Sequence, residues 1–150
     1  MRCLVSTVLV LSALSVWDAR ADECEAKAAE IAGKIGLDAG PRGADNSIPL
    51  SARSDEEDAY GAYLVCRGPL GMSLRYLSPP GPGPKWYEFV GRSAAILIGV
   101  KSASVVLEAR NCVENARLRD GVFRAPGSAL RITCSVSKND SRADLSLAAR

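Results

Sequence analysis

Five cysteines set the strongest limit on how this chain of 150 residues can fold. The first, Cys3, lies in an apolar N-terminal segment that we expect to be removed on export. The other four lie far apart in the sequence, and none forms a C-x-x-C pair. An even number in an exported chain predicts two disulfides, since zinc sites and thiol redox motifs usually need closely spaced cysteines. The predicted disulfide residues are Cys24, Cys66, Cys112 and Cys134.

The N-terminal segment has the pattern of a secretory signal peptide. Arg2 is followed by fifteen uncharged residues, and Ala19-Arg20-Ala21 supplies the small-x-small motif of a cleavage site. A membrane anchor, the alternative, needs about 20 apolar residues, and this run ends earlier, at Asp18. We therefore expect a signal peptide over residues 1–21 and a mature chain over residues 22–150. We place that chain in the bacterial periplasm or outside the cell, with no membrane span.

Periodicity in the mature chain predicts both helices and strands. Helical spacing follows Asp22, which we expect to cap the first helix with Glu25, and it returns over residues 86–98 and after a cap at Ser102 or Ser104. Alternation predicts strands over residues 48–53, 59–67, 72–76 and 130–136 and around residues 145–147. The expected fold is a single small α+β domain, with antiparallel β-hairpins, two to three helices packed on one face, and two disulfides.

One pattern occurs twice along the chain. A helix with an inward-facing cysteine precedes a strand with an inward-facing cysteine, first with Cys24 and Cys66, then with Cys112 and Cys134. A helix lying on a sheet brings such residues together, so we predict these two pairings. The alternative joins the helix cysteines to each other and the strand cysteines to each other. The pattern also suggests a pseudo-repeat of residues 22–77 and 86–150, joined by the Pro/Gly-rich connector 78–85, which we expect to be neither helix nor central strand.

Few residue types in the chain can support catalysis. There is no histidine, which excludes Ser-His and Cys-His nucleophiles and histidine-bound zinc. The acidic run Asp55-Glu56-Glu57-Asp58 is expected to be a solvated loop, with catalytic carboxylates or a weak cation site as alternatives. We identify no catalytic, cofactor-binding or metal-binding residue. Trp86, Tyr87 and Phe89 are expected in the core, although aromatic side chains there could instead stack on a sugar or a peptide.

Charge is unevenly distributed along the mature chain. Acidic residues dominate residues 22–60, whereas basic residues, mostly arginine, dominate residues 61–150. The net charge of the whole chain is only +2, which argues against nucleic acid as a partner. An anionic envelope component or a protein remains as the candidate partner.

These observations favour an exported, non-catalytic binding or envelope-accessory protein that needs no cofactor. One alternative is a small secreted hydrolase that uses carboxylates or a Ser/Lys pair. Another is an inhibitor of a secreted enzyme, with residues 78–85 as its protruding loop. A cleft, a binding surface or a rigid exposed loop would distinguish the three.

Overall fold

The computed structural model of the protein describes residues 15–52, 60–68, 71–119, 122–124 and 130–149. These residues form three helices and seven strands. The helices are α1 (Ser15–Ile35), α2 (Pro84–Ile98) and α3 (Ser102–Arg119). The strands are β1 (Leu37–Ala39), β2 (Ser47–Ala52), β3 (Ala62–Gly68), β4 (Gly71–Leu77), β5 (Phe123–Arg124), β6 (Leu130–Val136) and β7 (Ala143–Ala149).

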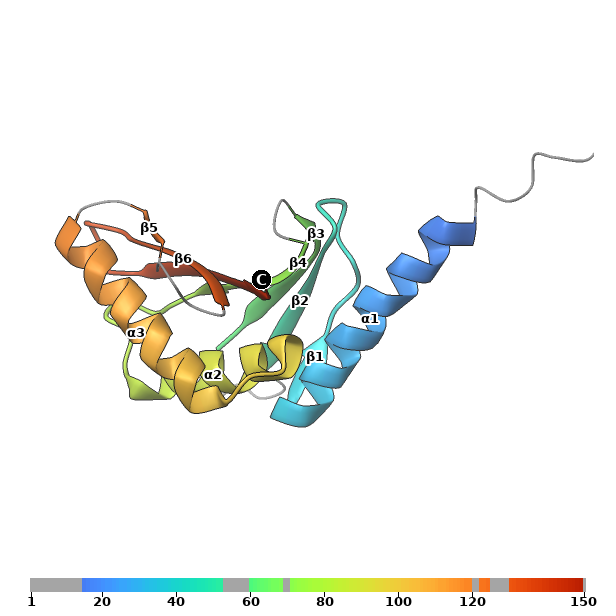
Figure 1. Ribbon diagram of the computed structural model, residues 1–150, viewed down its shortest axis with the longest axis horizontal. Helices are drawn as coiled ribbons and strands as arrows, with labels where there is room; N and C mark the ends of the chain where they lie inside the picture. The colour runs from blue at the N-terminus through green and yellow to red at the C-terminus, as the bar shows by residue number, and fades with distance from the viewer. Residues whose placement is uncertain (1–14, 53–59, 69–70, 120–121, 125–129, 150) are drawn as a thin grey trace, which may run out of the picture.

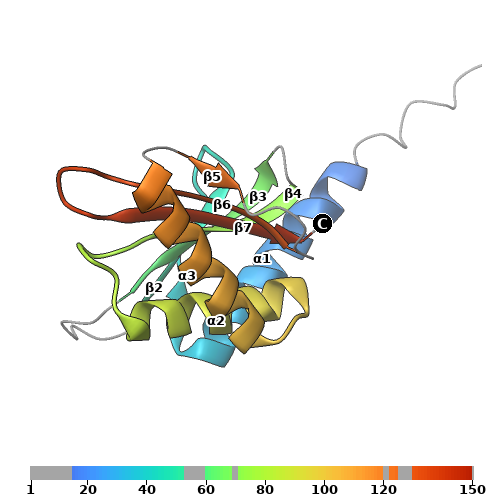
Figure 2. The same cartoon turned by 60° about the vertical axis from the view of Figure 1, so that its left-hand side comes forward.

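All seven strands form one antiparallel sheet in the order β1-β2-β3-β4-β7-β6-β5. The three helices lie on one face of this sheet (Figures 1 and 2). Helix α1 packs on β1 to β3, α2 on the central strands β4 and β7, and α3 mainly on β5 and β6. The structure thus has the expected α+β class, with helices on a single face and two disulfides.

Strand alternation directs one set of apolar side chains into the layer between sheet and helices. The central pair β4 and β7 places Leu74 opposite Leu147, and both side chains are fully buried. Trp86 and Val90 of α2 pack on these strands from the helix side. Burying a side chain of this size stabilises a fold by about 1.5–3 kcal/mol, so the core between the two layers supplies most of the stabilisation.

Both predicted disulfide pairings are present. Cys24 of α1 is bonded to Cys66 of β3, with 5.6 Å between their Cα atoms. Cys112 of α3 is bonded to Cys134 of β6, with 6.0 Å between their Cα atoms. Each disulfide therefore ties a helix to the strand beneath it. These bonds fit a protein that lies outside the cytoplasm, and no helix of the described residues is long and apolar enough to cross a bilayer.

The helix starts differ from the sequence prediction. Helix α1 begins at Ser15, so in the full chain Asp22 and Glu25 lie within the helix and not at its start. Helix α2 begins at Pro84, inside the segment that was expected to be non-helical. Proline is tolerated at the first helical position, because its missing N–H has no partner there in any case. In α3 the carbonyl of Lys101 accepts the first bonds, from the N–H groups of Ser104 and Val105.

Two strands were not predicted from the sequence because they are very short. β1 has three residues and β5 has two, which is too few for a visible alternation of apolar and polar residues. They form the two edges of the sheet. Short edge strands offer little unpaired backbone, which protects a sheet against pairing with other chains.

Candidate binding site on the helix-free face of the sheet

The face of the sheet opposite the helices carries two large apolar side chains in contact with solvent. Tyr63 of β3 is 44% exposed and Leu77 of β4 is 53% exposed. A solvated sheet face is normally polar, so these two residues depart from the usual pattern. The strand register places Tyr63 directly opposite Arg75. An aromatic side chain, an aliphatic side chain and a guanidinium are thus close together on this face.

These residues line an open pocket of about 360 Å³. Its walls come from β3, β4, the start of β2 and the loop that precedes β2. The lining residues are Asp45, Ser47, Tyr63, Val65, Arg75 and Leu77. This volume falls at the lower end of the range for ligand pockets, about 300–1,000 Å³. The pocket can hold one large side chain or a small molecule.

Arg75 is fixed in place by the neighbouring strand. Its Nε donates to Asp144 Oδ1 at 3.1 Å, and its Nη2 donates to Asp144 Oδ2 at 2.5 Å. This bidentate pair joins β4 to β7 and raises the pKa of Arg75, mainly through the hydrogen bond to Asp144. About half of the Arg75 side chain is still exposed. The pair therefore presents an oriented, accessible guanidinium at the side of the pocket.

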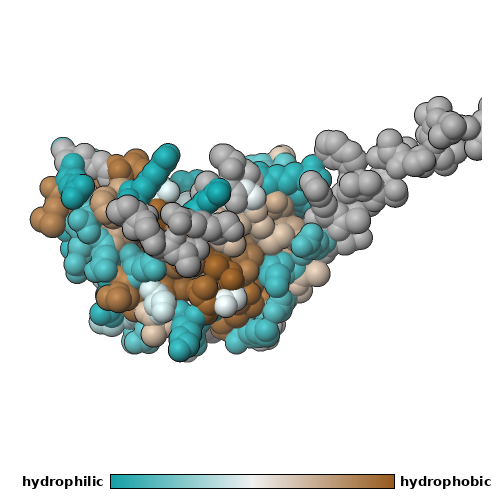
Figure 3. Space-filling model, viewed as in Figure 1, coloured by the Kyte–Doolittle hydropathy of each residue, from teal (hydrophilic) through white to brown (hydrophobic). Residues whose placement is uncertain are grey.

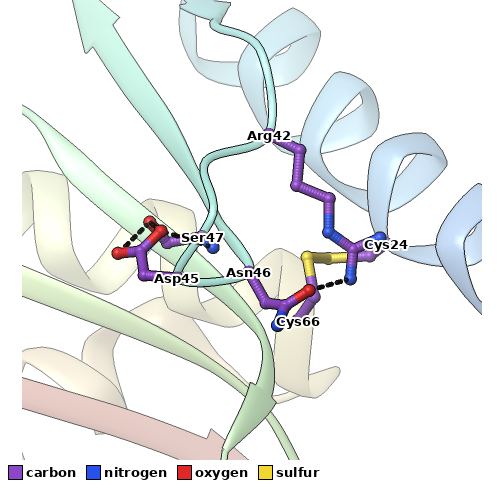
Figure 4. The surroundings of a disulfide bond; sticks show 6 residues. All are labelled: Cys24, Arg42, Asp45, Asn46, Ser47 and Cys66. Carbon is purple, nitrogen blue, oxygen red and sulfur yellow. Dashed lines mark hydrogen bonds between the residues drawn. A yellow bond between two sulfur atoms is a disulfide. The ribbon is translucent and has the colours of Figure 1, made fainter.

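Asp45 contributes a carboxylate to the opposite wall. Its two oxygens accept hydrogen bonds from Ser47 Oγ at 2.8 and 2.9 Å, and Oδ1 also accepts from the Ser47 N–H at 3.1 Å (Figure 4). These bonds stabilise the charged form and lower the pKa of Asp45. The pocket thus combines an ionised carboxylate, a fixed guanidinium and a phenol with the apolar side chains of Val65 and Leu77.

The loop that carries Asp45 is also attached to the first disulfide. Arg42 Nη2 donates to Asn46 Oδ1 at 3.1 Å, and the Asn46 carbonyl accepts from the N–H of Cys66 at 2.9 Å. Figure 4 shows the Arg42 side chain extending from this loop toward Cys24 and Cys66, whereas Asp45 and Ser47 lie on the other side of the loop. One segment therefore contacts the disulfide on one side and forms a pocket wall on the other.

The structure describes only some of the candidate functional residues that were identified from the sequence. Residues 55–58 lie outside the described part of the chain. Trp86, Tyr87 and Phe89 are buried in the core and present no aromatic surface. Their burial agrees with the packing role that was expected for them.

The connector 78–85 is held against the start of β7. The Ser78 Oγ accepts from the Ala143 N–H at 2.7 Å, the Ser78 N–H donates to the Ala143 carbonyl at 2.9 Å, and the Gly81 N–H donates to the Ser141 carbonyl at 3.2 Å. Ser78 is buried, while Pro79 and Pro80 are exposed. The connector is thus anchored at Ser78 and ends where Pro84 opens α2.

The pocket itself was not predicted from the sequence. A signal was nevertheless present, because Tyr63 and Leu77 alternate out of phase with the inward-facing Leu64 and Tyr76. A large apolar residue at an outward strand position marks an exposed apolar site. The contribution of Asp45 depends on the fold of the preceding loop and has no counterpart in strand periodicity.

Two other surface features lie near α2 and α3. Apolar side chains gather near α2 in the space-filling view (Figure 3). Ile96, Leu97 and Ile98 at the end of α2 are half-buried and pack against the core, so we regard them as its rim. A smaller pocket of about 200 Å³ lies between the end of α3 and the β6–β7 turn, and its lining includes Arg117 and Lys138.

Comparison with known protein families, curated proteins and solved structures found no match. The function must therefore be argued from the residues of the site.

Proposed function

We propose that this protein is an exported, non-catalytic binding protein whose helix-free sheet face binds a segment of a protein partner. The observation that carries the proposal is the grouping of exposed Tyr63 and Leu77 around Arg75. Tyrosine and arginine are enriched in protein interfaces, and a few such side chains usually provide most of the binding energy. Here they project from paired strands, which hold them more rigidly than a loop would.

The charges in the pocket also favour a protein segment. Asp45 and Arg75 carry opposite charges, and Arg75 is already paired with Asp144. A polyanion would be attracted to a surface with a clear positive excess. A peptide segment offers apolar, cationic and anionic groups together, which suits a pocket of this mixed character. An anionic envelope component is the alternative partner, and the smaller pocket beside Arg117 and Lys138 is its candidate site.

The protonation states in the pocket support binding over hydrolysis. Catalysis by two carboxylates needs one of them to have a raised pKa, so that it can donate a proton near neutral pH. The pKa of Asp45 is lowered by its hydrogen bonds to Ser47, and Asp144 is held in an ion pair with Arg75. Asp45 therefore lacks the raised pKa that a general acid needs.

Site-specific photo-crosslinking in the source cells tests the proposal. A benzoylphenylalanine at position 63 would lie in the proposed interface, whereas the same group at position 107 replaces Leu107, an exposed residue of α3. We expect position 63 to give a discrete protein adduct, and position 107 to give none of the same mass. Adducts of equal mass from both positions, or an adduct with lipid or glycan, would overturn the protein-partner proposal.

Substitution of the second apolar residue provides a quantitative check. Once the crosslinked partner is identified, Leu77→Ser should weaken its binding about tenfold or more, as for a side chain that contributes more than about 1.4 kcal/mol. Leu107→Ser, an equally large change on the helix side, should leave the affinity unchanged. Equal losses in both variants would show that the partner does not bind through the helix-free face.

A further inference from the structure

The two disulfides differ in their access to solvent. Cys112 and Cys134 are both buried, with exposed fractions of 0% and 1%. In the other bond Cys24 is fully buried, but Cys66 is only partly buried at the edge of the core. Exchange begins when a thiolate reaches one of the two sulfur atoms, so its rate depends on access. Cys66 is thus the least buried of the four disulfide cysteines, and an incoming thiolate should reach this bond more readily than the other.

The charges around the two bonds differ as well. Arg42 extends toward Cys24 and Cys66, and its Nε is buried without a hydrogen-bond acceptor (Figure 4). A neighbouring guanidinium stabilises a cysteine thiolate, and an unpaired N–H can donate to it. A thiolate released from this disulfide would therefore lie on the side toward which a positive charge extends.

The second disulfide lies against a carbonyl group instead. The Phe123 oxygen is 3.8 Å from Cys112 Sγ and 3.9 Å from Cys134 Sγ. The negative end of a carbonyl dipole disfavours a thiolate at either sulfur. Arg119 is near, but its guanidinium carbon lies over the Phe123 ring, 5.4 Å from the ring centroid. Burial and the carbonyl both oppose opening of this bond.

We propose that Cys66 is a thiol–disulfide exchange site, and that an exported dithiol reductant opens the Cys24–Cys66 bond while Cys112–Cys134 stays closed. A thiolate of the dithiol attacks Cys66 Sγ and forms a mixed disulfide. The Cys24–Cys66 bond breaks, and its electron pair leaves on Cys24 Sγ as a thiolate, toward which Arg42 extends. The second thiolate of the dithiol then displaces Cys66 Sγ. The dithiol is oxidised by two electrons to its disulfide, and its two protons end on Cys24 and Cys66.

Opening this bond has a local structural consequence. The disulfide is a covalent tie between α1 and β3, and the loop that contains Arg42 and Asn46 lies beside it. Without the bond, the loop keeps only its hydrogen bonds, such as the one from the Cys66 N–H to the Asn46 carbonyl. Exchange at Cys66 would therefore loosen the segment that includes the pocket residue Asp45. The exchange reaction itself does not depend on the proposed partner binding.

Timed reduction of the folded protein tests the inference. The purified protein is incubated with dithiothreitol without denaturant, and samples are alkylated, digested and mapped by mass. We expect Cys24 and Cys66 to be alkylated at least about tenfold faster than Cys112 and Cys134. Faster alkylation of Cys112 and Cys134, or simultaneous opening of both bonds at the rate of global unfolding, would overturn the inference.

A pair of arginine variants separates the effect of Arg42 from general charge loss. Arg42→Gln should slow opening of Cys24–Cys66 about threefold to tenfold, because the leaving thiolate loses its cation. Arg92→Gln removes an exposed arginine of α2 and should leave the rate unchanged. Circular dichroism confirms that both variants are folded. An unchanged rate in Arg42→Gln would remove the role of Arg42, and equal slowing in both variants would contradict a local effect.

Discussion

The two halves of the molecule, residues 22–77 and 86–150, each contain one disulfide and share one arrangement, but they contribute different residues to the candidate site. In each half a helix precedes antiparallel strands and is bonded to the strand next to the centre of the sheet, α1 to β3 and α3 to β6. The first half supplies every residue that lines the larger pocket. The second half supplies Asp144, which holds Arg75 in position. A common scaffold therefore carries the residues of the proposed binding pocket in one half and the partner that orients Arg75 in the other.

The strand order adds to this comparison. β4 and β7 are neighbours at the centre, with β3 and β6 outside them, so the halves meet through equivalent strands. A pseudo-repeat of residues 22–77 and 86–150 would produce this symmetric strand order. The pseudo-repeat itself stays a hypothesis. Among the described residues of the first half, no helix corresponds to α2. Helix α2 packs on α3 and α1 and covers the central strands, and thus joins the halves.

Removing each disulfide in turn should have the largest effect on stability. The bonds close loops with sequence separations of 42 and 22 residues. By chain entropy they stabilise the protein by about 4 and about 3.4 kcal/mol. We expect the double variant C24A/C66A to lose more free energy of unfolding than C112A/C134A, as measured by urea denaturation. A larger loss in C112A/C134A would show that native packing, and not loop length, determines the contribution of each bond.

Two glycine substitutions should move stability in opposite directions. A Cβ at Gly91 of α2 would lie 2.5 Å from Val106 Cγ2 and 3.0 Å from the Ser102 carbonyl oxygen, both on α3. Gly91→Ala should therefore cost about 1–3 kcal/mol by overpacking. A Cβ at Gly33 of α1 meets nothing within 4 Å, and Gly33→Ala should stabilise the helix by about 0.5–1 kcal/mol.

Thermal and urea unfolding of both variants provide the measurement. Destabilisation by Gly91→Ala would confirm that α2 and α3 are in close contact and that the second half depends on this approach. Equal stability of Gly91→Ala and the parent protein would mean that the two helices can separate at little cost. That result would weaken the assignment of α2 as the element that joins the halves.

The fold class and both disulfides could be predicted from the sequence, because the positions of single residues carry the necessary information. Helix periodicity and strand alternation placed Cys24 and Cys112 on helix faces and Cys66 and Cys134 on strand faces, which was sufficient to predict both disulfides. Local patterns could not predict the two-residue and three-residue edge strands, nor the sheet order that brings β4 beside β7. The pairing of Arg75 with Asp144 follows from that order, so the site could not be assembled before the topology was known.

The buried pair of Tyr76 and Ser93 predicts a loss of stability in alkali. Tyr76 Oη and Ser93 Oγ are 2.8 Å apart and connect β4 to α2, and burial raises the pKa of Tyr76. The unfolded chain releases the phenol proton near pH 10, whereas the folded protein keeps it. The unfolded state then binds fewer protons, so the free energy of unfolding falls as pH rises above about 10, by up to about 1.4 kcal/mol per pH unit from this group.

Tyr76→Phe isolates this contribution. At neutral pH the variant should lose about 0.5–1.5 kcal/mol, because one hydrogen bond is removed while Ser93 Oγ still donates to the Phe89 carbonyl. Above pH 10 its stability should fall less steeply than that of the parent protein. Parallel pH profiles from urea unfolding would show that another group causes the alkaline loss.

The smallest effect is expected from an ion-pair cluster on α1 in the first half. Glu30 accepts hydrogen bonds from Lys27 at 2.5 Å and Lys34 at 2.7 Å, which lower its pKa to about 2. A carboxylate with a lowered pKa in the folded state stabilises the fold above its ordinary pKa, and this contribution is lost as pH falls from about 4.3 toward 2. The cluster is solvated, so salt screens it and the net stabilisation is small. Glu30→Gln should therefore lower the urea midpoint slightly at low salt and leave it unchanged at high salt. A loss that persists at high salt would mean that Glu30 acts through helix packing, and the first half would then depend on its surface as well as on its disulfide.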